Sequence, residues 1–322
     1  MEIVHNQKEP VIILGHARSG TSILGDLLRK YLRISFGPES QFLIRFYKLL
    51  PRYGDLTQEK NLSRLLHDVL QERCFQRWQN KFGYSLDEAE IFSRIQEPGY
   101  KGIVYAVFHY LAQCGGMQRW GDKTPMYNLH LDIIQELFPD SRYIHMVRDG
   151  RDVALSVFQT NFGSRNVYNV AGNWNRHLQK VHEFRETLPG DQFLEMRYEE
   201  LMQDPARQLT RLIPFLDVHD PDQAVQQYIQ DNIEHDLKKN NFDKWKTRMS
   251  GQDIFLFETI ARDWLRAYDY ELKNDGNLPD SLPAWKRFYW EVQDKRAKIM
   301  DRESLQDNVY KLKTRMRHML RR

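Results

Sequence analysis

The chain has 322 residues, of which 41% are hydrophobic, 12% aromatic and 28% charged, and its formal net charge is +3. This composition is typical of a globular chain, and so small a net charge by itself indicates no polyanionic partner. Two cysteines, Cys74 and Cys114, are too few for a metal site or a disulfide framework, which favours a reducing compartment. The polar N-terminus and the lack of a long apolar run predict a cytoplasmic protein without a signal peptide or membrane span.

A glycine-rich loop follows the first apolar run, Val-Ile-Ile-Leu, which predicts a short buried strand. Gly15 and Gly20 bracket this loop before a predicted helix, a layout that lets backbone N–H groups and a helix N-terminus approach an anion. A P-loop nucleotide triphosphatase would continue with Lys and then Ser or Thr, but this chain continues with Thr21 and Ser22. Because the cation is Arg18 inside the loop, we expect an anion other than Mg-bound ATP. A turn without a ligand is the alternative.

Strands and helices alternate over residues 10–216, which predicts a three-layer αβα fold with a P-loop-like parallel sheet. A second short strand is expected at 34–37, with Glu39 just past its end, where open α/β sheets place their ligands. Apolar residues at helical spacing predict a helical insertion of about 70 residues, over about 41–115. We assign its aromatic side chains to the core, and an acceptor pocket is the alternative.

Two further corners of the predicted sheet carry cations. A strand at 117–120 leads to Lys123, after which Thr124 is expected to cap a helix whose apolar face starts with Leu129. A strand at 142–147 ends at Arg148, and Ser156 lies on the next helix, facing back toward the strand end. One guanidinium and one hydroxyl are suited to a terminal phosphate. For Lys123 alone, a solvated side chain is the alternative.

These segments together resemble the sulfotransferases that use 3′-phosphoadenosine 5′-phosphosulfate (PAPS). The matching pieces are residues 15–22, 121–125, 148–156 and 197–201, in the family's order, within a resemblance that covers residues 10 to about 272. The resemblance implies PAPS as the co-substrate and adenosine 3′,5′-bisphosphate as the product. It also implies that the 5′-phosphosulfate is bound by Gly15, His16, Ala17, Arg18, Ser19, Gly20, Thr21 and Ser22.

Within this family the chain is most similar to the branch of tyrosylprotein, carbohydrate and related bacterial sulfotransferases, in which a glutamate after the second strand is the base. Glu39 takes that place, and His16 is the rival base; a carboxylate that merely answers a helix dipole is the alternative reading. Arg18 and Lys123 are expected to stabilise the bridging oxygen of the donor. No metal is expected, because the sulfuryl group carries less charge than a phosphoryl group.

The resemblance also implies nucleotide contacts outside the loop. Arg148 and Ser156 would bind the 3′-phosphate, and the basic stretch with Lys244, Lys246 and Arg248 would close over it. In the same stretch Trp245 is a candidate stacking partner. Tyr198 is assigned to the nucleotide pocket, with a buried structural tyrosine as an equal alternative.

The predicted catalytic domain covers residues 1–275, and a basic helical C-terminal extension covers 276–322. Residues 284–322 contain twelve Lys or Arg and five Asp or Glu. A tail helix packed on the domain is the plainest interpretation. The alternatives are contact with an anionic acceptor, peripheral contact with an acidic membrane surface, or contact with a second subunit in a homodimer. No pattern in the sequence indicates recognition of nucleic-acid bases.

We therefore predict transfer of a sulfuryl group from PAPS to a hydroxyl or amine acceptor. The acceptor stays open among a glycan, a peptide tyrosine, a lipid and a small metabolite. Two other classes are the alternatives. A metal-dependent P-loop kinase of a small molecule would turn over Mg-ATP, and a non-catalytic nucleotide-binding module would not need Glu39.

Overall fold

The computed structural model describes residues 3–6, 9–160, 163–237 and 241–283, together with 285, 288–290 and 292–293. The described chain forms two compact units. The first unit contains the stretches up to residue 16, 20–147 and 180–239, and the second contains 17–19, 148–179 and the chain from 240 onward.

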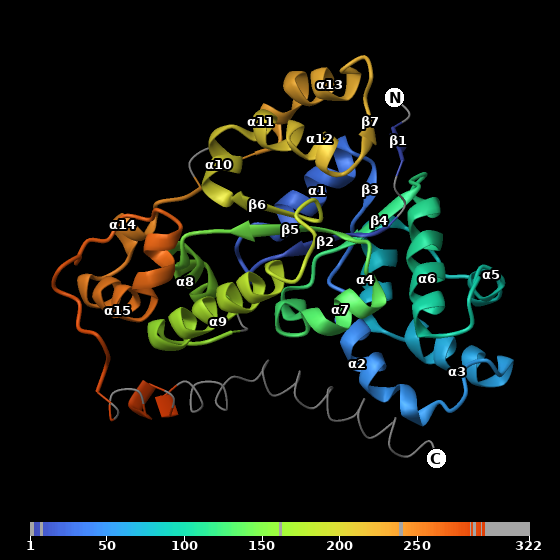
Figure 1. The fold of residues 1–322 in the computed structure, drawn as a ribbon, viewed down its shortest axis with the longest axis horizontal. Coiled ribbons are helices and arrows are strands. Elements are labelled where there is room, and N and C mark those ends of the chain that lie inside the picture. The colour runs from blue at the N-terminus through green and yellow to red at the C-terminus, as the bar shows by residue number, and fades with distance from the viewer. Residues whose placement is uncertain are drawn as a thin grey trace. The chain divides into compact units, whose positions relative to one another are not determined.

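A five-stranded parallel sheet is the centre of the first unit (Figure 1). Its order is β3-β4-β2-β5-β6, and every neighbouring pair is parallel. The strands are β2 (Val11–Leu14), β3 (Ile34–Ser35), β4 (Arg119–Asp122), β5 (Arg142–Val147) and β6 (Phe193–Arg197). All four side chains of β2 are buried, as expected for a central parallel strand covered on both faces. Helices flank the sheet, and the predicted α/β fold is confirmed.

Strands β2 and β5 lie side by side, with Leu14 paired to His145. From β2 the chain continues to β3 on one side of the sheet, whereas from β5 it continues to β6 on the other side. Ligands of open α/β sheets bind beyond the strand ends at such a switch point. The glycine-rich loop and Arg148 therefore follow two adjacent strands that end at the same edge.

Helices make up most of the remaining first unit. They are α1 (Thr21–Tyr31), α2 (Phe42–Leu49), η1 (Leu50–Arg52), α3 (Glu59–Leu70), α4 (Arg73–Phe82), α5 (Glu88–Ser93), α6 (Tyr100–Cys114), η2 (Pro125–Leu129), α7 (Leu131–Leu137), α10 (Tyr198–Gln203), α11 (Pro205–Thr210), α12 (Leu212–Phe215), α13 (Ala224–Asn232) and η3 (Ile233–His235). A short antiparallel pair joins β1 (Val4–His5) to β7 (Val218–His219).

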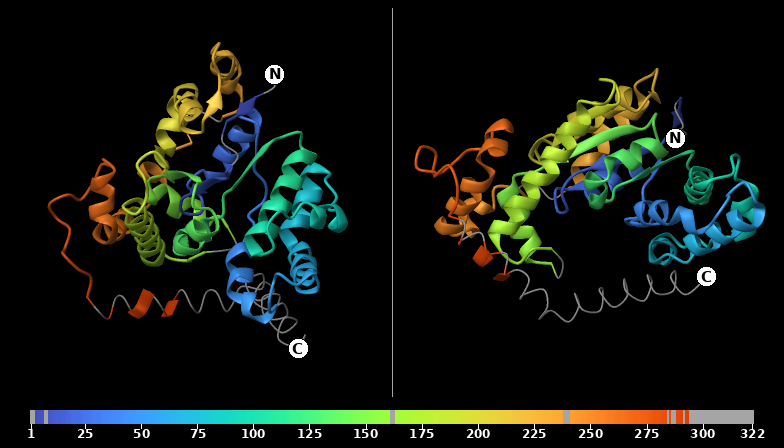
Figure 2. Two further views of the ribbon diagram at one scale, coloured as in Figure 1. Left: turned by 45° about the vertical axis from the view of Figure 1, so that its right-hand side comes forward. Right: turned by 60° about the horizontal axis from the view of Figure 1, so that its bottom comes forward.

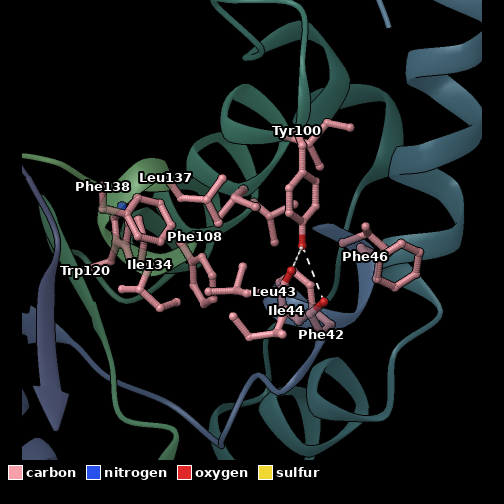
Figure 3. Packing of buried hydrophobic residues seen from close by; sticks show 14 of the residues in the cluster. Phe42, Leu43, Ile44, Phe46, Tyr100, Phe108, Trp120, Ile134, Leu137 and Phe138 are labelled. Atoms are coloured by element: carbon pink, nitrogen blue, oxygen red, sulfur yellow. Dashed lines mark hydrogen bonds between the residues drawn. The ribbon is translucent and has the colours of Figure 1, made fainter. Parts of the chain in front are cut away.

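The helices α2–α6 form one group beside the sheet in both views of Figure 2, and residues 42–114 are helical wherever they are regular. Their aromatic side chains mostly lie in the core, where Phe108 stacks on Trp120 of β4 with ring centroids 4.5 Å apart. The Tyr100 hydroxyl points at the start of α2 and donates to the carbonyl of Leu43 at 2.9 Å (Figure 3). The assignment of these aromatic residues to the core is confirmed.

The structure corrects the predicted helix after β4. Thr124 lies at the N-cap position, but its side chain makes no capping bond. The chain first forms the 3₁₀-helix η2 and turns at His130 before α7 begins. Because a 3₁₀-helix has three residues per turn, Leu129 leaves the apolar stripe that continues in α7, and 41% of it is exposed.

The second unit contains α8 (Gly150–Phe158), α14 (Trp245–Arg248), α15 (Gly251–Ala267) and the first part of α9 (Val167–Arg185). Ser250 caps α15, because its hydroxyl accepts from the backbone N–H of Asp253 at 3.1 Å. Most of the predicted basic extension lies outside the described residues. In its described part, the carbonyl of Trp290 accepts from the Asn166 side-chain amide at 2.9 Å. In the described ranges, no helix combines the length and apolar character that crossing a bilayer requires.

Candidate functional site

The glycine-rich loop folds as a tight backbone turn between β2 and α1. A Cβ atom on Gly15 would lie 2.7 Å from the carbonyl oxygen of Met146, so a side chain does not fit there. Gly20 has φ +95°, in the left-handed region that glycine adopts readily. The first turn of α1 carries no acidic residue. The helix N-terminus therefore keeps the positive end of its dipole uncompensated by a local carboxylate.

Tyr198 lies directly against this loop. A Cβ on Gly20 would come within 2.4 Å of the Tyr198 ring, which is fully buried. The residue therefore supports the loop by packing. Of the two interpretations from the sequence, the structure supports the buried structural tyrosine. The Tyr198 side chain has no exposed surface that could contact a nucleotide.

Arg18 belongs with residues 17–19 to the second unit. It adopts φ +73°, which is uncommon for a residue with a side chain and costs roughly 1–2 kcal/mol. Its Nε donates to the Ser156 hydroxyl on α8 at 2.9 Å. The Arg18 carbonyl accepts from Nη1 of Arg148 at 2.9 Å. Arg148 and Ser156, which the sequence assigns to one phosphate site, thus each contact Arg18.

Arg148 is largely buried and is held from several sides. Its Nη2 donates to the carbonyl of Asn241 at 3.0 Å, and the Asp152 carboxylate lies 3.9 Å from the same nitrogen. The indole N–H of Trp174 donates to the Arg148 carbonyl at 3.2 Å. The guanidinium is therefore fixed before any ligand arrives, which lowers the entropy lost on binding.

The basic stretch after Asn241 divides into different roles. Lys244 donates to the Asn241 side chain, next to the Arg148 contact. Lys246 instead pairs with Asp243 and Glu271, each at 3.3 Å. Arg248 is exposed at the end of α14. Lys246 is thus engaged in two ion pairs, whereas Arg248 is exposed.

Trp245 is a packing residue in this structure. Its side chain is 1% exposed, and the guanidinium of Arg151 lies 3.4 Å from the ring centroid. Its backbone N–H donates to the Asp152 carboxylate at 2.9 Å. With one ring face covered by a cation and the rest buried, Trp245 offers no surface to an adenine, so the predicted stacking role is not supported.

Lys123 and Asn128 of η2 contact the same loop region within the first unit. Lys123 Nζ donates to the hydroxyl of Ser22 at 2.9 Å, at the start of α1. The Asn128 side-chain oxygen accepts from the backbone N–H of Gly15 at 3.4 Å. The predicted proximity of Lys123 to the loop is therefore seen. Asn128 was not predicted, because an asparagine in a turn carries no distinctive sequence signal.

Glu39 is half-buried in the connection from β3 to α2, and the Gln41 side chain donates to it at 3.4 Å. Close to it in space is Asp122, whose pKa rises to about 6, mainly through burial, with the charge of Glu39 as a smaller contribution in the same direction. His16, the rival base, is half-buried in the loop. No set of three His, Cys, Asp or Glu side chains in the described part of the chain is arranged to hold a metal ion.

A model of the sulfotransferase family matches residues 10–222, which include the loop, Glu39, Lys123, Arg148 and Ser156. The chain belongs to the sulfotransferase family. The stretch from Asn241 onward lies beyond this match.

Individual relatives of this chain are distant. It is 24% identical over 220 residues to the protein-tyrosine sulfotransferase of Drosophila melanogaster, a match that covers 66% of this chain and 39% of the fly protein. It is 27% identical over 135 residues to the omega-hydroxy-beta-dihydromenaquinone-9 sulfotransferase Stf3 of Mycobacterium tuberculosis, covering 37% of this chain and 34% of Stf3. The matched part is thus well under two thirds of either relative.

Solved structures agree on the fold. The sulfotransferase domain from the curacin biosynthetic pathway superposes with a TM-score of 0.55 at 20% identity, covering 83% of this chain and 99% of that chain. The sulfotransferase domain from the Synechococcus PCC 7002 olefin synthase gives 0.51 at 22% identity, covering 83% and 98%. At these identities the likeness establishes the α/β architecture.

Proposed function

We propose that this sulfotransferase uses PAPS as donor and transfers its sulfuryl group in line to a hydroxyl or amine acceptor. The observation that carries the proposal is the contact of Arg18, Arg148 and Ser156 in the second unit. A guanidinium and a hydroxyl are suited to a terminal phosphate monoester, such as the 3′-phosphate of the donor. The loop with the N-terminus of α1 would bind the 5′-phosphosulfate.

The main requirement of this reaction is to stabilise the negative charge that develops on the leaving group. As in phosphoryl transfer, the protein mostly aligns the attacking oxygen and neutralises charge that develops on the leaving oxygen. Arg18 and Lys123 would supply that charge; Arg18 bonds the Ser156 hydroxyl within the second unit, and Lys123 bonds the Ser22 hydroxyl within the first. The sulfuryl group carries one negative charge fewer than a phosphoryl group, so these two cations would suffice without a metal.

Glu39 would accept the proton of the acceptor, a step that typically contributes about 10²- to 10⁴-fold in rate. Its position just after β3 supports this role, because the loop and Lys123 come from the neighbouring strands β2 and β4. Lys244 and Arg248 would complete the 3′-phosphate site from the stretch beyond Asn241. Tyr198, Trp245 and Lys246 are left out of the proposed contacts because packing or ion pairs occupy them.

For the acceptor, we propose a hydroxyl group. Tyrosine, in the name of the fly relative, and an omega-hydroxy compound, in the name of the mycobacterial relative, both carry one. The acceptor would be sought by incubating the protein with radiolabelled PAPS and a panel of a tyrosine peptide, 4-nitrophenol and cell extract, with products identified by mass.

The decisive variant is Glu39→Gln, with Glu59→Gln as its matched control on an exposed helix start. We expect Glu39→Gln to lower transfer about 10²-fold or more while affinity for adenosine 3′,5′-bisphosphate stays at the wild-type value. Glu59→Gln should change neither. Transfer that survives in Glu39→Gln would remove the base assignment and favour a non-catalytic nucleotide-binding module or another base.

The donor site is tested separately by titrating adenosine 3′,5′-bisphosphate into Arg148→Ala and Ser156→Ala. Arg148 is buried, so Ser156→Ala serves as the variant that should keep the fold. Both should bind at least tenfold more weakly. Wild-type affinity in both would disprove the 3′-phosphate assignment, and turnover of Mg-ATP in place of PAPS would favour the kinase alternative.

A further inference from the structure

A buried polar cluster lies behind the proposed base in the first unit. It consists of Ser40, Asp122, Thr124 and Tyr127, whose side chains are 2%, 4%, 1% and 0% exposed. Asp122 ends β4, Thr124 and Tyr127 follow it, and Ser40 is the residue after Glu39. Burying a carboxylate is costly unless hydrogen bonds compensate it, so the donors that surround Asp122 need explanation.

Two hydrogen bonds of this cluster lead from the Ser40 amide through the Thr124 hydroxyl to the Asp122 carboxylate. The Thr124 hydroxyl donates to Asp122 Oδ1 at 2.7 Å, and the same oxygen of Thr124 accepts from the backbone N–H of Ser40 at 3.0 Å. An ionised carboxylate only accepts, so it fixes the hydroxyl hydrogen of Thr124 and leaves a lone pair for Ser40. The Ser40 hydroxyl bonds both the Asp122 carboxylate and the Tyr127 hydroxyl.

The bond to Ser40 acts on Glu39 through the backbone. The N–H of Ser40 and the C=O of Glu39 belong to one planar peptide group, so holding that N–H fixes the orientation of the peptide. The connection is short, because β3 ends at Ser35 and α2 begins at Phe42. Gln41 next to it is in the left-handed region with φ +42°, a conformation that persists only where the surroundings enforce it.

We propose that Asp122 is a positioning residue for the base: through Thr124 it anchors the Ser40 amide and thereby sets where the Glu39 carboxylate points. This inference rests on the proposed role of Glu39. Asp122 does not touch the acceptor or the donor in this scheme. A displacement of the carboxylate by about 1 Å can cost about 10²-fold in rate, so the anchor is a substantial part of the base's efficiency.

The test compares Thr124→Val, which removes the hydroxyl at nearly constant volume, with Thr124→Ser, which keeps it. Amide hydrogen exchange resolved over residues 36–42 needs no acceptor substrate, and it directly measures how well the Ser40 amide is protected by its hydrogen bond to Thr124. The Ser40 amide should exchange about tenfold faster or more in Thr124→Val and in Asp122→Ala, and at nearly the wild-type rate in Thr124→Ser. Unchanged exchange in both Thr124→Val and Asp122→Ala would overturn the proposal.

Steady-state kinetics then test the effect on catalysis. They use the acceptor from the panel that becomes labelled by radiolabelled PAPS. Thr124→Val and Asp122→Ala should each lower kcat about tenfold or more, with affinity for adenosine 3′,5′-bisphosphate unchanged. The double variant should be no worse than Asp122→Ala alone, because Asp122→Ala already breaks the bond through Thr124 as well as the bond to the Ser40 hydroxyl. A faster-exchanging Ser40 amide with wild-type kcat would refute the positioning role.

The Glu39→Gln background separates this proposal from the one it rests on. If Glu39 is the base, adding Thr124→Val to Glu39→Gln should cause no further loss of kcat. If Glu39→Gln alone keeps wild-type kcat, the base assignment fails, whatever the exchange data say. If Glu39→Gln lowers kcat and Thr124→Val lowers it by the same further factor in both backgrounds, Asp122 and Thr124 act elsewhere and the positioning role fails.

Discussion

The second unit contains a buried ion pair whose removal should be costly. Arg151 Nη1 donates to Glu258 on α15 at 2.8 Å, and both side chains are fully buried. Glu258 also accepts from the backbone N–H of Lys273 at 3.0 Å and from both the backbone and side-chain N–H groups of Asn274, at 3.0 and 2.8 Å. One carboxylate therefore joins α8, α15 and the chain after α15.

Glu258→Gln is the perturbation that removes this charge at constant shape. Breaking a buried pair from one side costs about 3–5 kcal/mol, because the remaining charge stays buried and uncompensated. Asp149 still pairs with Arg151 at 2.8 Å, which reduces the loss. The new amide, however, would direct its N–H₂ group at the donors of Asn274. We therefore expect a loss near the lower limit, about 3 kcal/mol in the free energy of unfolding.

Urea denaturation followed by circular dichroism measures this loss from the shift of the midpoint. Asp275→Asn is the matched control, since Asp275 pairs with Arg266 of the same helix but both side chains are half exposed. Exposed pairs contribute at most about 1 kcal/mol. If Glu258→Gln shifts the midpoint no further than Asp275→Asn, the reasoning from burial is refuted.

Three further predictions concern the first unit. Gly20→Ala should lower stability by at least about 1–2 kcal/mol from backbone strain alone and weaken nucleotide binding, seen in thermal unfolding and in titration with adenosine 3′,5′-bisphosphate. Burial raises the pKa of Asp122 from 3.8 to about 6, so the folded state binds the proton more tightly than the unfolded state. The resulting stabilisation is complete well below pH 3.8 and is lost as the pH rises through 6. Asp122→Asn should remove this loss, which is about 2 kcal/mol between pH 4 and 7 and is measured by urea denaturation at those two pH values. Trp120→Ala should cost about 3–5 kcal/mol, whereas Leu129→Ala should stay within about 0.5 kcal/mol, and equal effects of the two on the urea midpoint would contradict the burial assigned to them.

Local patterns predicted the elements that depend on local physics. The run before Gly15 is apolar because β2 is covered on both faces, and a helix that starts at Gly150 places Ser156 about two turns along, facing back to the loop. The contact of Arg148 with the Arg18 carbonyl followed from the sheet, because both corners end adjacent parallel strands. These inferences required only periodicity and strand ends.

Contacts between distant segments were not predictable in the same way. Trp245 was expected to face a nucleotide, but its ring packs against the guanidinium of Arg151, which lies 94 positions earlier. No sequence spacing predicts a contact between residues so far apart. The bond between Thr124 and the Ser40 amide joins residues 84 positions apart. Leu129 was misplaced for a local reason, because a 3.6-residue period was assumed where the chain forms a 3₁₀-helix.

The packing of Tyr198 against Gly20 has a consequence for sequence variation. The space that a side chain at position 20 would need is filled by the aromatic ring at position 198. A side chain at position 20 would need both a smaller residue at position 198 and a different backbone conformation at position 20. Sulfotransferases with this arrangement should therefore keep glycine at position 20 wherever a large aromatic ring stands at position 198.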